Sequence, residues 1–102
     1  MLVLKGENGK SRMIDIILDA MNSICFAYND YPLHFKDCIW FNSKIYQLEA
    51  LKLGIFQEVN LYQKGDYDCL IIYTNENESD LKDFIDWLKM TFTYRNIIVA
   101  CK

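Results

Sequence analysis

The stretch YDCLIIYTNENESDLKDFIDWLKMTF, residues 67–92, carries the strongest structural signal in this chain of 102 residues. Its first part, Tyr67 to Thr74, is rich in β-branched and aromatic side chains and predicts a strand. Residues 69–72 are apolar at every position, which is typical of a strand that is buried on both faces and central in its sheet. A polar linker follows, and apolar side chains then recur at helical spacing over residues 81–92, which predicts an amphipathic helix.

Upstream of this stretch, the sequence predicts a partner strand. The run from Ile55 to Gln63 alternates in part, with Val59 on one face and Glu58 on the other. The segment Lys64-Gly65-Asp66 that separates the two runs has the composition of a turn. We therefore predict an antiparallel hairpin that returns through Tyr67 to Thr74.

The remaining elements are predicted on either side of the hairpin. Leu2–Lys5 and Ile97–Cys101 are short apolar runs and indicate the first and last strands. From residue 11, one dry helical face is formed by Ile14, Ile17, Leu18 and Met21. Ser43 is expected to cap a short helix, Lys44 to Leu53, which ends at Gly54.

Two segments between these elements are ambiguous. Ile24 to Tyr28 fits either an extension of the first helix or a short strand, and His34 to Asn42 is rich in aromatic residues but has no clean period. Without this middle region, the order of elements is that of the ferredoxin-like β-α-β-β-α-β unit. We predict one α+β domain, residues 1–102, with a mixed or antiparallel sheet of about four strands and two to three helices.

The bulk composition indicates a globular protein of the cytoplasm. Hydrophobic residues make up 52% of the chain, which is enough for a core. No apolar run approaches the roughly twenty residues of a membrane span, and no signal-peptide pattern is present, so neither a membrane anchor nor export is expected. The four cysteines lie in apolar stretches without a C-x-x-C pair, which predicts reduced structural thiols; they are Cys25, Cys38, Cys69 and Cys101.

Motifs for catalysis or for cofactor binding are weak. The segment Gly6 to Ser11 is similar to a phosphate-binding loop, but it has two residues before Gly-Lys-Ser where a Walker loop has four, and one of the two is Glu7. His34 is the only histidine, which excludes metal sites that need two imidazoles. We therefore predict no catalytic, cofactor-binding or metal-binding residues, and a protein that is not an enzyme.

Charge is distributed unevenly along the chain. Residues 66–86 hold seven acids and one base, whereas the whole chain has a net charge of −3. A local negative field of this kind steers encounters with basic surfaces, and aromatic side chains anchor such interfaces. The predicted partner-contact residues are Asp66, Tyr67, Asp68, Glu76, Glu78, Asp80, Asp83, Asp86 and Trp87.

These observations predict a small acidic protein-interaction module that binds a basic partner protein, such as an inhibitor, an immunity or antitoxin-like factor, or a mobile-element accessory protein. One alternative is a winged-helix-like nucleic-acid-binding domain that uses the helix Lys44 to Leu53 and Lys64. The seven bases of residues 1–65 are scattered among seven acids, which disfavours nucleic acid. A second alternative is a degenerate nucleotide binder at Gly6 to Ser11. The sequence does not indicate an oligomeric state.

Overall fold

The computed structural model describes the chain outside residues 7–9, 30–34, 36–37, 43–46, 62–66 and 93–95. It contains a five-stranded sheet with the order β1-β5-β4-β2-β3, in which every neighbouring pair is parallel. The strands are β1 (Leu2–Lys5), β2 (Ser23–Tyr28), β3 (Cys38–Phe41), β4 (Cys69–Thr74) and β5 (Asn96–Cys101). The helices are α1 (Lys10–Ala20), α2 (Leu48–Phe56) and α3 (Lys82–Thr91). A π-helical turn (Gln57–Leu61) follows α2, and a 3₁₀ turn (Glu78–Leu81) precedes α3.

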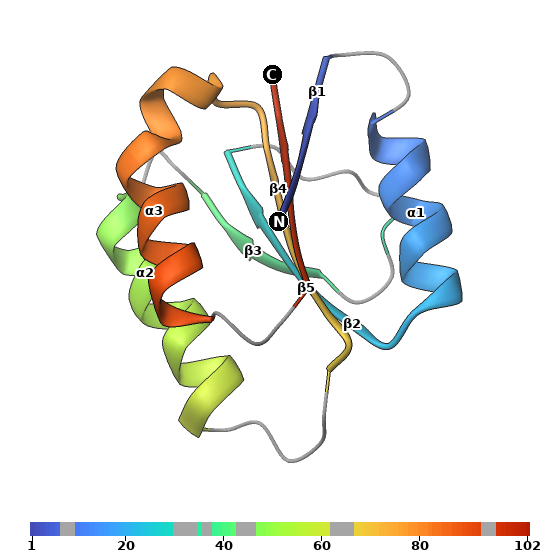
Figure 1. Ribbon diagram of the computed structural model, residues 1–102, viewed down its shortest axis with the longest axis horizontal. Coiled ribbons are helices and arrows are strands. Elements are labelled where there is room, and N and C mark those ends of the chain that lie inside the picture. Colours follow the sequence, from blue (N-terminus) through green and yellow to red (C-terminus); the bar gives the residue numbers. More distant parts are fainter. Residues whose placement is uncertain (7–9, 30–34, 36–37, 43–46, 62–66, 93–95) are drawn as a thin grey trace.

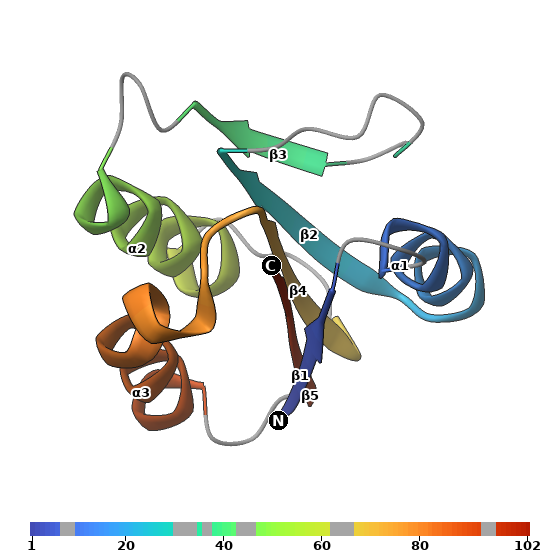
Figure 2. The same cartoon turned by 90° about the horizontal axis from the view of Figure 1, so that it is seen from above.

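Helices cover both faces of the sheet. Helix α1 lies on one face, and α2 and α3 lie together on the other (Figures 1 and 2). The central strand β4 divides its side chains between the two layers, because Leu70 and Ile72 join the core under α2 and α3, while Ile71 and Tyr73 join the core under α1. All six residues of β4 are buried, which confirms the sequence prediction of a central strand.

The predicted mixed or antiparallel sheet of about four strands is wrong, and so is the ferredoxin-like order. In the described part of the chain the predicted hairpin is absent, because the chain stays helical from Leu48 through the π-helical turn. Leu51, Ile55 and Val59 are all buried in the core beneath α2 and α3. Their spacing of four residues forms one helical stripe. Burial of this stripe outweighs the partial alternation after Ile55 that indicated a strand. The predicted turn at 64–66 lies outside the described residues.

Gly54 does not end the predicted short helix but lies inside α2. A methyl group at this position would overlap the ring of Phe41 in β3, so the glycine permits a close approach between helix and strand. The helix begins at Leu48, and the predicted cap at Ser43 falls outside the described residues. The ambiguous run Ile24 to Tyr28 is a strand, since it lies within β2.

The chain crosses the sheet in opposite directions on either side of its centre. After β2 it continues to β3, and after β4 it passes through α3 to β5 on the other side. Because all strands are parallel, their carboxyl ends share one edge of the sheet. The connections therefore reverse direction between β2 and β4, which is the topological switch point of the sheet. Open parallel sheets usually bind ligands at this point. None of the helices described above is long and apolar enough to cross a bilayer.

Candidate functional site

The switch point carries a small polar cluster that is satisfied internally. Asn29 follows β2 with a φ of 72°, a left-handed conformation that asparagine tolerates better than most residues. Its Nδ2 donates a hydrogen bond to Oε1 of Glu76 at 2.9 Å, and the Glu76 N–H donates to Oγ1 of Thr74 at 3.1 Å. Burial and the nearby Glu76 carboxylate raise the pKa of Tyr28. Because Asn29, Glu76 and Thr74 hydrogen-bond to one another, we assign this cluster a structural role.

Lys10, the lysine of the loop that is similar to a phosphate-binding motif, points into the protein. Its side chain is buried, and its Nζ donates a hydrogen bond to the carbonyl oxygen of Thr74 at 2.7 Å. The same Nζ lies 5.0 Å from the centroid of the Tyr73 ring, in cation–π contact. Lys10 therefore holds the start of α1 to the end of β4. Residues 7–9 of the motif lie outside the described residues.

We expect no nucleotide binding at this loop. Two residues of a Walker loop are missing from the sequence, and the Lys10 ammonium already has protein partners. Isothermal titration of the protein with ATP and Mg²⁺ is expected to give no heat of binding. Micromolar affinity that is lost in a folded Lys10→Ala variant would contradict this prediction.

The acidic residues of the segment 66–86 that the structure describes do not form a single surface. Asp68 precedes β4 at the amino edge of the sheet, whereas Glu76 and Glu78 follow the strand at the carboxyl edge. The six residues of β4 between them span about 20 Å. Asp66 lies outside the described residues.

Two of the acids at the carboxyl edge have partners within the protein. Glu76 accepts the hydrogen bond from Asn29, and Glu78 forms an ion pair with Lys5. The hydrogen bond to Glu78 raises the pKa of Lys5. The remaining three acids are exposed on the 3₁₀ turn and on α3, and we call them the acid ridge: Asp80, Asp83 and Asp86.

The two predicted aromatic anchors are half-buried and packed against the core under α2 and α3. Trp87 lies between Phe84 and Phe92, with ring centroids 6.0 and 5.7 Å away. Lys52 Nζ lies over the Trp87 ring, 5.8 Å from its centroid. Much of the Trp87 side chain is therefore used in folding, as is much of Tyr67. That these two residues and the acids contact a partner remains a prediction.

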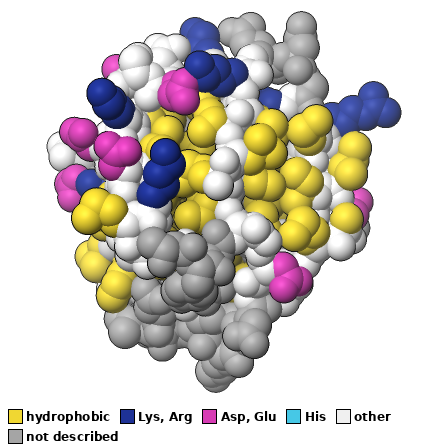
Figure 3. Space-filling view, in the orientation of Figure 1, with side chains coloured by type: hydrophobic (Ala, Val, Ile, Leu, Met, Phe, Trp, Pro, Cys, Tyr) yellow, Lys and Arg dark blue, Asp and Glu magenta, His cyan; other side chains and the backbone are white. Residues whose placement is uncertain are grey.

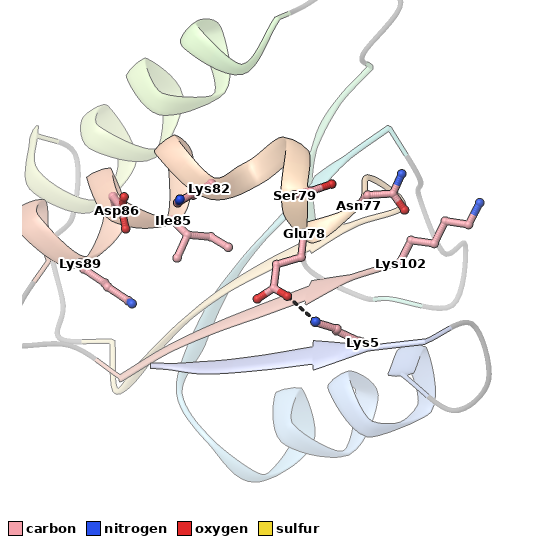
Figure 4. A pocket seen from close by; sticks show the side chains of 9 residues that line it. All are labelled: Lys5, Asn77, Glu78, Ser79, Lys82, Ile85, Asp86, Lys89 and Lys102. Atoms are coloured by element: carbon pink, nitrogen blue, oxygen red, sulfur yellow. Dashed lines mark ion pairs between the residues drawn. The ribbon is translucent and has the colours of Figure 1, made fainter.

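Beside the acid ridge lies a groove that the sequence did not indicate. Its volume is about 620 Å³, and it runs between α3 and the ends of β1 and β5 (Figure 4). Four lysines line it, together with two acids: Lys5, Lys82, Lys89 and Lys102, with Glu78 and Asp86. Lys5 and Lys102 come from opposite ends of the chain, and their proximity could not be predicted from the sequence. Only Lys82 and Lys89, two turns apart on one face of α3, could be predicted to lie together. In space, the acidic segment is bordered by positive charge.

The groove ends at β1, which is an edge strand. Within the described part of the chain, β1 pairs with β5 alone, so its outer edge has no neighbouring strand. Figure 3 shows two apolar areas on this side of the molecule, separated by a white band, one toward α1 and one toward α3. Leu2, Met13 and Ile16 are exposed on the side of α1, with 49%, 48% and 60% of their surfaces accessible. The opposite edge, β3, is flanked by residues outside the described set.

Metal binding has no visible support in these surfaces. Among the residues that the structure describes, no three acidic, cysteine or histidine side chains gather where they could share an ion. His34 lies outside that set. Neither the family models, nor the curated proteins, nor the solved structures include a match to this chain.

Proposed function

We propose that this chain is a protein-interaction module that accepts an extended segment of a partner protein as an added strand beside β1. The observation that carries the proposal is the unpaired outer edge of β1, together with exposed apolar side chains on the strand and on α1. An edge strand presents a row of backbone N–H and C=O groups that a second chain can pair with. In strand addition, these groups supply affinity and the flanking side chains supply specificity.

The side of the edge toward α1 supports an apolar contact. Met13 and Ile16 lie one turn apart on α1, and Leu2 lies on the strand itself. Each exposes about half of its surface. Covering that surface would contribute about 1 kcal/mol per side chain. Apolar side chains of an added strand would meet this patch, which we call the α1 patch: Leu2, Met13 and Ile16.

The side of the edge toward α3 supports a contact with negative charge. Side chains alternate between the two faces of an added strand. Those that point away from the α1 patch would enter the groove, where Lys82 and Lys89 lie beside the Lys5–Glu78 pair. The geometry therefore favours a partner segment in which apolar and acidic residues alternate.

A second copy of the chain is a poorer occupant of the same edge. If two β1 strands paired about a two-fold axis perpendicular to the sheet, each sheet face would continue into the other copy. Lys5 of each copy would then point toward the lysine-lined groove of the other. Repulsion between these lysines disfavours that pairing.

This proposal retains the interaction class that the sequence predicts but moves the contact surface. The sequence favours a basic partner for residues 66–86, because seven acids and one base lie within these 21 residues. In the folded chain, Glu76 and Glu78 have partners within the protein, and four lysines line the groove that Asp86 shares. An acidic segment at β1 uses the lysines as well as the edge, and so it agrees with more of the observed geometry.

A display library of random octapeptides, selected on the purified protein, tests the proposal. Selected peptides are expected to alternate apolar and acidic residues. Ile16→Glu should weaken their binding about tenfold or more, because it places a charge in the α1 patch. Leu53→Glu is the matched control, since Leu53 is 59% exposed on α2 and Ile16 is 60% exposed on α1. The control should bind the peptides normally.

Two results would contradict the proposal. One is a selection that enriches no peptide. The other is a set of peptides that bind the Ile16→Glu variant as tightly as the parent protein. If the double variant Asp80→Lys/Asp83→Lys, in which neither residue lines the groove, loses binding instead, the partner surface is the acid ridge and the β1 proposal is wrong.

A further inference from the structure

Two of the four cysteines lie side by side. Cys25 of β2 and Cys38 of β3 are partners in the register of these two strands. Their sulfur atoms are 3.5 Å apart, and both side chains belong to the core under α1. Cys25 is fully buried, whereas Cys38 is half-buried on the edge strand. The pair therefore has one fully buried thiol and one that is partly exposed.

The other two cysteines are less well placed for pairing. Cys101 packs on the opposite face of the sheet, in the core under α2 and α3. Cys69 shares the α1 side with Cys25, but the register partner of Cys25 in β4 is Ile71, two residues further along the strand. All four thiols are free in the structure.

The thiols of Cys25 and Cys38 differ in acidity. The hydrogen bond between them lowers the pKa of Cys38 and raises the pKa of Cys25. Cys38 is thus the thiol that ionises first, and it is also the more exposed one. A thiolate that is both accessible and stabilised is the nucleophile in thiol–disulfide exchange.

We infer that Cys25 and Cys38 form a dithiol that closes reversibly to a disulfide between β2 and β3. Register neighbours in a sheet have Cα atoms roughly 5 Å apart, which is within the range that a disulfide spans. The two sulfur atoms must approach from 3.5 Å to a bond of about 2 Å, which side-chain rotation can provide. The sequence indicated four structural thiols, and only the register shows that two of them meet.

A low-molecular-weight disulfide such as oxidised glutathione is the oxidant that fits the exposed thiol. The Cys38 thiolate attacks one glutathione sulfur, which forms a mixed disulfide and releases the first glutathione as a thiolate. That thiolate takes up the proton of the Cys25 thiol, and Cys25 then attacks the Cys38 sulfur and displaces the second glutathione as a thiolate. The second thiolate takes up the proton that Cys38 released to solvent when it ionised. The protein loses two electrons and two protons, and oxidised glutathione is reduced to two glutathione thiols.

The exchange reaction can be followed by intact mass in buffers of reduced and oxidised glutathione. With excess oxidised glutathione, the folded chain is expected to lose two hydrogen atoms, and digestion should yield one linked peptide pair that contains Cys25 and Cys38. Dithiothreitol should restore the original mass. Before oxidation, brief treatment with iodoacetamide should modify Cys38 before the other three cysteines.

Matched variants separate this pair from the other cysteines. Cys69→Ser and Cys101→Ser should still lose two hydrogen atoms, whereas Cys38→Ser should not form an internal link. Circular dichroism verifies that each variant is folded, and the unmodified chain alone suffices for the peptide mapping if a variant is not. A link through Cys69 or Cys101 would overturn the inference. So would an unchanged mass, or stable glutathione adducts without an internal link, in excess oxidised glutathione.

Discussion

Replacing Ile72 with alanine is expected to lower the free energy of unfolding by about 2–5 kcal/mol, and replacing Ile71 should have a similar cost. Both side chains are fully buried, but they lie on opposite faces of β4. A sheet that was covered on one face only would tolerate one of the two changes. Urea unfolding followed by circular dichroism measures both variants against the parent protein.

Ile16→Ala is the control for this pair, because it removes the same atoms from a side chain that is 60% exposed on α1. Its expected effect is within about 0.5 kcal/mol. A nearly neutral result for either Ile71→Ala or Ile72→Ala would mean that one face of β4 is open, and the arrangement of helices on both faces would be wrong.

Lys10→Met is expected to destabilise the fold by about 1.5–3 kcal/mol, the usual contribution of a hydrogen bond to a charged group. Methionine has a similar length but cannot donate to the Thr74 carbonyl or place a cation over Tyr73. Lys82→Met, on the exposed face of α3, should change stability by less than about 0.5 kcal/mol. Thermal and urea unfolding of the two variants give the comparison.

A neutral Lys10→Met variant would contradict the structural role of this lysine. It would mean that the two contacts of the Lys10 ammonium only offset the cost of burying it.

The sequence predicted the elements whose periodicity is unambiguous. The buried run that became β4 and the amphipathic stretch that became α3 are both where they were predicted, because one period dominates in each. The residues after Gly54 were misassigned, because partial alternation and a stripe of four-residue spacing overlap there. Only tertiary packing decides between the two periods, and it favours the helix, which buries Ile55 and Val59 together.

Local sequence patterns could not predict whether neighbouring strands are parallel or antiparallel. A parallel neighbour and an antiparallel neighbour impose the same apolar requirement on a buried strand such as β4. The difference lies in the connections, and the loss of the predicted hairpin left crossovers through α2 and α3 as the routes into and out of β4.

The candidate surfaces were missed for a related reason. Lys5 and Lys102 are at opposite ends of the sequence but line the same groove as Lys82 and Lys89. A count of charge along the chain therefore gave an acidic segment where the folded surface is mixed. The exposure of Ile16 could not be predicted either. The sequence of α1 does not indicate which of its apolar residues lie outside the face that the sheet covers.

The most direct test of β1 as the partner-binding edge is amide hydrogen exchange, residue by residue, in the free protein and with a selected octapeptide bound. In the free protein, the amides of β1 that point away from β5 should exchange rapidly, because their edge is unpaired. The bound peptide is expected to slow exchange within Leu2–Lys5 about tenfold or more, and to leave the amides of β3 unchanged. Protection that appears at the acid ridge, with none in Leu2–Lys5, would contradict the proposal.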